Sequence, residues 1–180
     1  MAAIPNIDTV GPMRGTATWF RVVHVLGLSA WLGALLLLTA MTGRLEDLVG
    51  SAHTAQAVIL EGLATVERFS LVVVPVLLLT LIFGWRSRDT ARRGRAAACL
   101  ILGALLLVSR WVGRPYLERV RASLGWPIEA LPPSDPSWSE YSWAVFVMQA
   151  LVALQILILV WLLVAAVRQN PVRSRSVIEL

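Results

Sequence analysis

Four long apolar runs, separated by polar connections, dominate the pattern of the sequence. A helix needs about 20 apolar residues to cross the hydrocarbon core of a bilayer. The runs therefore predict four transmembrane helices, at about residues 17–41, 69–85, 96–114 and 141–167. The last run has no charged residue, and a helix that is apolar on every face belongs in lipid or in a very large core. A chain of 180 residues is too short for such a core.

The connections between the runs set the expected orientation. Residues 86–95 carry five arginines, and three more follow the fourth run. Short arginine-rich segments stay on the cytoplasmic side of a membrane, and two crossings between these segments satisfy both placements. Acidic residues gather in the other two connections. We therefore predict an all-α protein with a single domain over residues 1–180, an antiparallel bundle of four transmembrane helices with a cytoplasmic N-terminus and a cytoplasmic C-terminus.

Both outer connections carry short amphipathic patterns of their own. Apolar residues recur at helical spacing over 54–68, which predicts a helix that either lies on the membrane surface or extends the second span outward. Residues 115–140 are expected to form an outer cap, in which a helical stripe continues the third span as far as Leu124. Asp135 followed by Pro136 is typical of a helix start, so the fourth helix is expected to begin there.

Composition and charge narrow the class of protein further. Apolar residues make up 57% of the chain and charged residues 15%, against about 45–50% and 25% in soluble proteins, so lipid is the expected environment. All sixteen basic residues are arginine, which we interpret as the codon bias of a GC-rich bacterium. The expected location is a bacterial inner membrane. The net charge of +5 would suit nucleic acid if the arginines followed one helix face, but they gather in the connections. The expected partners are the lipid bilayer and other membrane subunits, with no nucleic acid.

Ionisable side chains near the predicted spans are the candidate functional residues, because each costs about 2.5–3.5 kcal/mol at the centre of a bilayer. Arg21 lies within a turn of the cytoplasmic end, where its long side chain reaches the surface. Arg114 lies at the outer end of the third span and is expected to anchor it. Arg110, one turn deeper, either pairs with an outer carboxylate such as Glu67 or Glu140 or binds an anionic lipid head group.

His24 lies about two turns below the cytoplasmic surface, on the same side of its helix as Arg21. It either hydrogen-bonds a neighbouring helix or serves as an axial ligand to haem b, a role that histidines of transmembrane helices commonly have. His53 belongs to the opposite connection, so the two histidines cannot ligate one iron from both sides. We expect His24 and Arg110 to mark two separate sites.

Other chemistry is sparse in the sequence. There is no catalytic constellation, no cysteine pair and no methionine-rich ladder, so neither a catalytic site nor a metal site is predicted. No Asp or Glu falls within the predicted spans, which leaves ion transport without a proton or sodium relay. Small residues are abundant in the first span, where Ser29 with Gly33 and Ala30 with Ala34 form two small-xxx-small pairs. They predict that this helix packs centrally through this face.

A histidine, an apolar spacer and then Trp-Leu-Gly follow one another between Trp19 and Gly33. This run resembles the first helix of a broad bacterial group that holds CopD-like domains, HemJ-type protoporphyrinogen oxidases and uncharacterised four-helix families. The resemblance implies a four-helix membrane fold. HemJ-like enzymes carry a further histidine after the first helix and a lysine in a later one, whereas residues 41–44 read Met-Thr-Gly-Arg here and the chain has no lysine. The likeness is therefore greatest to the uncharacterised members.

These patterns lead to one leading function and two alternatives. We expect an integral membrane protein without a catalytic site of its own, which acts as an accessory or assembly subunit of a larger membrane complex. The first alternative is a haem b-binding redox protein that uses His24 as an axial ligand, and the second is a small-molecule or ion transporter. HemJ-like oxidase activity is the enzymatic alternative that the resemblance implies. The expected cofactor is none, or haem b in the first alternative.

Overall fold

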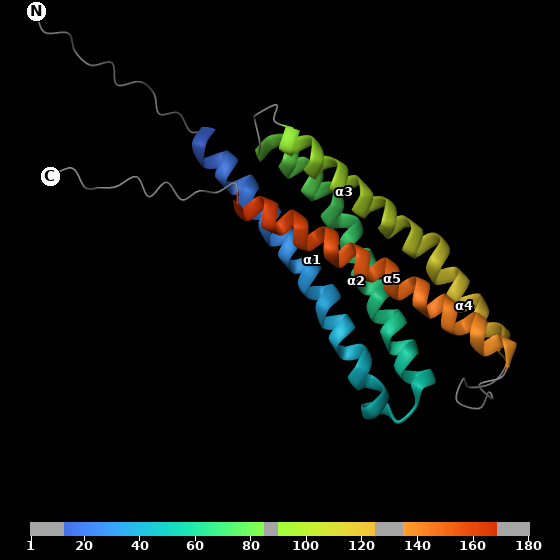
Figure 1. The fold of residues 1–180 in the computed structure, drawn as a ribbon. Helices are drawn as coiled ribbons and strands as arrows, with labels where there is room; N and C mark the ends of the chain where they lie inside the picture. The colour runs from blue at the N-terminus through green and yellow to red at the C-terminus, as the bar shows by residue number, and fades with distance from the viewer. Residues whose placement is uncertain (1–12, 85–89, 125–134, 169–180) are drawn as a thin grey trace, which may run out of the picture.

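The computed structural model describes residues 13–84, 90–124 and 135–168, and every regular element within these ranges is a helix. Figure 1 shows the third helix, a π-helical segment and the fourth helix as one continuous rod, so the chain forms four long rods. In chain order the elements are α1 (Met13–Val49), α2 (Ala52–Gly84), α3 (Thr90–Val108), η1 (Ser109–Gly113), α4 (Arg114–Ser123) and α5 (Pro136–Arg168).

The helices carry four stretches that are long and apolar enough to cross a membrane. These are Thr18–Thr42, Thr54–Phe83, Arg93–Ser123 and Pro136–Arg168. The prediction of an all-helical protein with four candidate spans is therefore confirmed. The second and third stretches are longer than the apolar runs alone, because their flanking segments continue the same helices. In particular, the amphipathic stretch over 54–68 extends the second span and is not a separate surface helix.

The segment expected to form an outer cap, residues 115–140, is partly helical. Its first part belongs to α4, whose apolar stripe is buried at Leu117 and Val120. Residues 125–134 lie outside the described residues. α5 begins at Pro136, as predicted, because the Asp135 carboxylate accepts a hydrogen bond from the backbone N–H of Ser137 at 2.8 Å. This bond satisfies one of the amide groups that the start of a helix leaves without an intrahelical partner.

Two clusters of buried side chains hold the rods together. In the first, all four rods contribute, and the members with the lowest exposure include Leu28 and Trp31 of α1, Leu77 of α2, Leu102 of α3 and Leu159 of α5. The second cluster joins α4 and α5 to one part of α2, and α1 supplies no buried residue to it. The rods are therefore packed together at one end of the molecule, and the α1–α2 pair diverges from the α4–α5 pair toward the other end (Figure 1).

Glycines allow close packing of α1 against α2, but Gly33, one of the small residues that the sequence pattern indicated, is not among them. A Cβ atom at Gly27 would lie 3.3 Å from Leu77, and one at Gly62 would lie 2.8 Å from Leu38. A Cβ atom at Gly33 would meet nothing within 4 Å. The prediction that the Gly33 face packs inside the bundle is therefore wrong, because the larger residues of the first cluster occupy the inward face of α1.

Candidate functional site

His24 joins α1 to α2 through a hydrogen bond in the buried interior. The imidazole is 0% exposed, and its Nδ1 lies 2.8 Å from Oγ1 of Thr80. The Thr80 hydroxyl donates to the carbonyl oxygen of Leu77 at 2.8 Å, so its hydrogen is already engaged. His24 Nδ1 therefore carries a proton and donates to Thr80, and in a neutral ring Nε2 is then the acceptor nitrogen. This is the interhelical hydrogen bond that was one of the two roles expected of His24.

Arg95 of α3 is the third residue of this buried polar group, beside His24 and Thr80. It is 2% exposed, and its guanidinium interacts electrostatically with His24. The sequence did not single out Arg95 because it ends an arginine-rich connection. The spacing of the residues could have indicated that Arg95 is buried. Arg95, Cys99 and Leu102 follow one another at intervals of four and three residues, on one face of the helix, and all three are buried.

Axial ligation of haem is the other role expected of His24. A haem ligand needs one ring nitrogen directed at a cavity large enough for the macrocycle. His24 is 0% exposed, and it lines neither the cavity between α1, α2 and α5 nor the groove between α3 and α5 that Ala98, Ile101 and Trp161 line. Within the described ranges, no three His, Cys, Asp or Glu side chains come together as a metal site. Haem ligation by His24 stays a prediction that rests on the position of this histidine in a transmembrane helix.

Glu67 and Ser109 form a second buried polar contact. Glu67 is 2% exposed, and its Oε1 accepts a hydrogen bond from the Ser109 hydroxyl at 2.7 Å. Its Oε2 is also buried and has no hydrogen-bond partner among the described residues. Ser109 is the first residue of η1, and single π-helical turns inside α-helices frequently occur at functional sites. A carboxyl and a hydroxyl thus meet where the third rod departs from α-helical geometry.

Sequence reasoning missed Glu67 because residues 54–68 were assigned to an outer connection. The expectation that no acidic residue lies within a span is corrected, since the candidate span Thr54–Phe83 includes both Glu61 and Glu67. Helical spacing could have indicated that Glu67 is buried. Leu63, Glu67 and Ser70 follow at helical intervals and are all buried, so they mark the inward face of α2.

The three candidate arginines have different surroundings. Arg21 is partly buried near the start of the first candidate span. Arg114 lies at the start of α4, where its Nε is 2.7 Å from Oε1 of Glu118 one turn later. Arg110 is partly buried in η1, and within the described part of the chain it pairs with neither Glu67 nor Glu140. An anionic head group as the partner of Arg110 remains a prediction.

The structure does not bring His24 and Arg110 together. His24 contacts Thr80, whereas Arg110 follows Ser109, which contacts Glu67. Thr80 follows Glu67 by 13 positions on α2, which correspond to about 20 Å of helix at ~1.5 Å per residue. The two polar contacts are thus separate, and a ligand of ordinary size cannot touch both.

Comparisons with known proteins identify no relative of this chain. No protein-family model, no curated protein and no solved structure matches the chain. The resemblance of the first helix to the CopD-like and HemJ-like group stays a prediction, and the function is inferred from the described residues.

Proposed function

We propose that this chain is a four-span protein of a bacterial inner membrane, without a catalytic site of its own, which acts as an accessory or assembly subunit of a larger membrane complex. The bundle is antiparallel, with both termini in the cytoplasm. The observation that carries this proposal is the small-residue face of α1, formed by Ser29, Ala30 and Gly33, which the other three rods leave open.

The small-residue face differs from the rest of the exposed surface of α1. Ser29 and Ala30 are exposed, and a Cβ atom at Gly33 would have nothing within 4 Å. Large aliphatic side chains cover the neighbouring exposed positions, such as Leu26 and Leu37. A lipid-facing helix gains nothing from glycine, which costs about 1 kcal/mol in helix propensity relative to alanine. Small residues instead let the backbone of a second transmembrane helix approach closely, which is the contact expected of a subunit.

The proposed orientation rests on the arginine-rich segments and can be tested with single cysteines in a Cys99→Ser background. Intact cells are treated with a thiol reagent that cannot cross the membrane. A cysteine at Ser139, which is exposed near the start of α5, should react from outside. A cysteine at Ser87, in the segment with five arginines in ten residues, should react only after the cells are opened. The opposite labelling pattern would refute the orientation.

The subunit proposal predicts that Gly33→Leu releases the chain from its complex without unfolding it. Leucine at Gly33 fills open space in the isolated chain, so the melting temperature should stay within a few degrees of the parent, while the closer approach of a partner helix is lost. The measurement is native electrophoresis of membranes extracted in a mild detergent, which should show a discrete complex for the parent and the single chain for Gly33→Leu.

Gly94→Leu is the matched control for this experiment. Gly94 is also exposed, and a Cβ atom there would likewise meet nothing within 4 Å, but it lies on α3, away from the small-residue face. The control should migrate with the complex. If the parent migrates as a single chain, or if Gly33→Leu stays in the complex, the proposal fails.

A further inference from the structure

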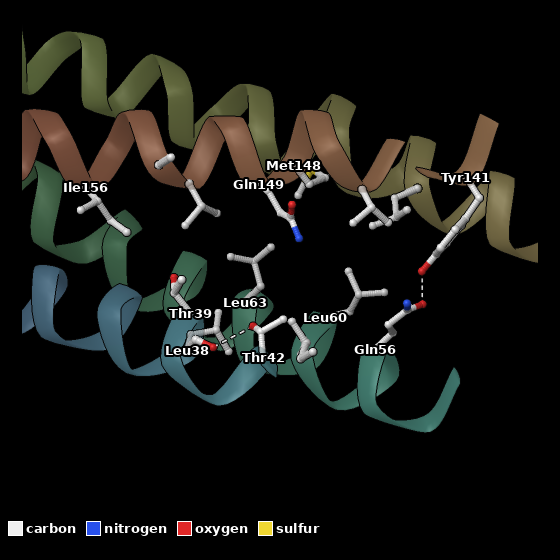
Figure 2. A pocket seen from close by; sticks show the side chains of 15 residues that line it. Leu38, Thr39, Thr42, Gln56, Leu60, Leu63, Tyr141, Met148, Gln149 and Ile156 are labelled. Carbon is white, nitrogen blue, oxygen red and sulfur yellow. Dashed lines mark hydrogen bonds between the residues drawn. The ribbon is translucent and has the colours of Figure 1, made fainter. Parts of the chain in front are cut away.

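A cleft lies between the α1–α2 pair and the α4–α5 pair, where the two pairs diverge. It has a volume of about 590 Å³ and is lined by side chains from residues 38–42 of α1, 56–63 of α2 and 141–156 of α5, together with Leu117 of α4. Small-molecule pockets usually measure about 300–1,000 Å³. The cleft is thus large enough for a small ligand, and Figure 2 shows it as an elongated space between α5 on one side and α1 and α2 on the other.

The threonines of the α1 wall present hydrogen-bond acceptors to the cleft. The Thr39 hydroxyl donates to the backbone carbonyl of Leu35 at 2.8 Å, and the Thr42 hydroxyl donates to that of Leu38 at 2.9 Å. Each hydroxyl has a single hydrogen, which is engaged in these bonds, so only oxygen lone pairs are left for a ligand. A ligand group that binds these threonines must therefore be a donor.

The opposite wall supplies a carboxamide. Gln149 extends from α5 into the middle of the cleft (Figure 2), and no other described residue forms a hydrogen bond with it. This amide can both donate and accept a hydrogen bond. At one end of the cleft the Tyr141 hydroxyl donates to Oε1 of Gln56, so this oxygen is already engaged, whereas the amide oxygen and the N–H groups of Gln149 are both open to a ligand.

Among the described residues, no arginine, histidine, aspartate or glutamate lines the cleft. A charged ligand head would have no counter-charge there and would lose its hydration without compensation. The remaining walls are mainly aliphatic, with Ile156 at the end opposite Tyr141 (Figure 2) and Val152 one helical turn before Ile156 on α5. The lining is therefore complementary to a long apolar chain that carries an uncharged head with at least one hydroxyl group.

We propose that the cleft binds a neutral single-chain amphiphile with a hydroxyl-bearing head, of the monoacylglycerol type. The head hydroxyl donates to Thr42 and its oxygen accepts from the Gln149 amide, while the chain lies along Val152 and Ile156. In the orientation proposed above, the cleft opens at the outer end of the bundle, so the amphiphile enters from the outer leaflet. This binding site is distinct from the small-residue face of α1.

Photo-cross-linking tests the site. The protein is reconstituted in lipid nanodiscs together with a monoacylglycerol that bears a photoactivatable group in its acyl chain. The expected result is cross-linking to the α1 and α5 walls, mapped by mass spectrometry. Ala153→Phe places a ring in the cleft and should lower cross-linking by about tenfold or more, equivalent to ~1.4 kcal/mol of binding. Ala150→Phe is the matched control, because Ala150 is exposed on the same helix but does not line the cleft. Equal cross-linking of the two variants would overturn the proposal.

Competition and a second variant test the class of the head group. Unlabelled monoacylglycerol should displace the probe, whereas a fatty acid anion and a quinone without a hydroxyl group should compete at least about tenfold less well. Gln149→Leu should weaken monoacylglycerol about tenfold and remove this preference. Equal competition by the anion or the quinone would overturn the proposed head group. Gln149 is exposed, so Gln149→Leu should fold even if Ala153→Phe does not. If Gln149→Leu still prefers monoacylglycerol over the anion and the quinone, this result alone would overturn the proposal.

Discussion

Trp31→Ala should lower the free energy of unfolding by about 3–5 kcal/mol, the loss typical of truncating a buried tryptophan. The Trp31 side chain is 0% exposed and belongs to the cluster that joins all four rods. In a lipid environment the loss comes mainly from the missing dispersion contacts around the cavity, since lipid is as apolar as the side chains themselves. Reversible unfolding in mixed micelles with an increasing fraction of a denaturing detergent measures the effect.

Two further variants separate packing from the chemistry of the indole. Trp161→Ala truncates the same residue type where it is 52% exposed, and its effect should stay within about 0.5 kcal/mol. Trp31→Phe keeps most of the ring and removes a buried indole N–H that lacks a hydrogen-bond partner among the described residues, so it should cost much less than Trp31→Ala. Equal losses for Trp31→Ala and Trp161→Ala would contradict the position of Trp31 in the core.

The number of rods and the start of α5 could be predicted from the sequence because they depend on local properties. A long apolar run is sufficient for a candidate span, and the Asp135 side chain caps a helix only two residues away. The extent of α2 could not be predicted in the same way. Residues 54–68 are amphipathic whether the helix lies on a membrane or continues a span, and only their packing against other helices decides between the two.

The inward face of each rod was harder to predict, for a physical reason. In a soluble protein the apolar face of a helix is the buried face, but a helix in lipid is apolar on both sides. Small residues then suggested the wrong face of α1, whereas the buried polar residues His24, Glu67, Thr80 and Arg95 mark the inward faces of their rods. Polar groups are costly in lipid and turn toward protein, so their spacing was the more informative signal.

The cleft could not be predicted from the sequence at all. It exists because the α1–α2 pair and the α4–α5 pair diverge, and that divergence follows from the distribution of large side chains over two separate clusters. Gln149 looks like an isolated polar residue in the sequence of α5. Its significance comes from Thr39 and Thr42, which line the same cleft from a helix more than 100 residues away in the chain.

Ser109→Ala should destabilise the bundle by about 1–3 kcal/mol, because it leaves a buried acceptor without its donor. In the parent, the Ser109 hydroxyl is the described hydrogen-bond donor to the Glu67 carboxyl, which is 2% exposed. Without it, neither carboxyl oxygen has a partner among the described residues. Ser123→Ala is the matched control on the same rod, since the Ser123 hydroxyl donates only to the carbonyl of Val120 within its own helix and the residue is exposed. Its effect should stay within about 0.5 kcal/mol.

The double variant Glu67→Met/Ser109→Ala shows whether the two polar groups act as a pair. Methionine has a similar length and no charge and adapts to irregular space, so the second substitution removes the carboxyl that Ser109→Ala leaves unsatisfied. Replacing both members of a buried polar pair by apolar groups is often close to neutral, and the double variant should therefore recover most of the stability that Ser109→Ala loses. The single variant Glu67→Met completes the comparison. If the losses of Glu67→Met and Ser109→Ala simply add in the double variant, Glu67 and Ser109 are not coupled in the folded protein. The hydrogen bond between α2 and η1 then does not stabilise the third rod against the second.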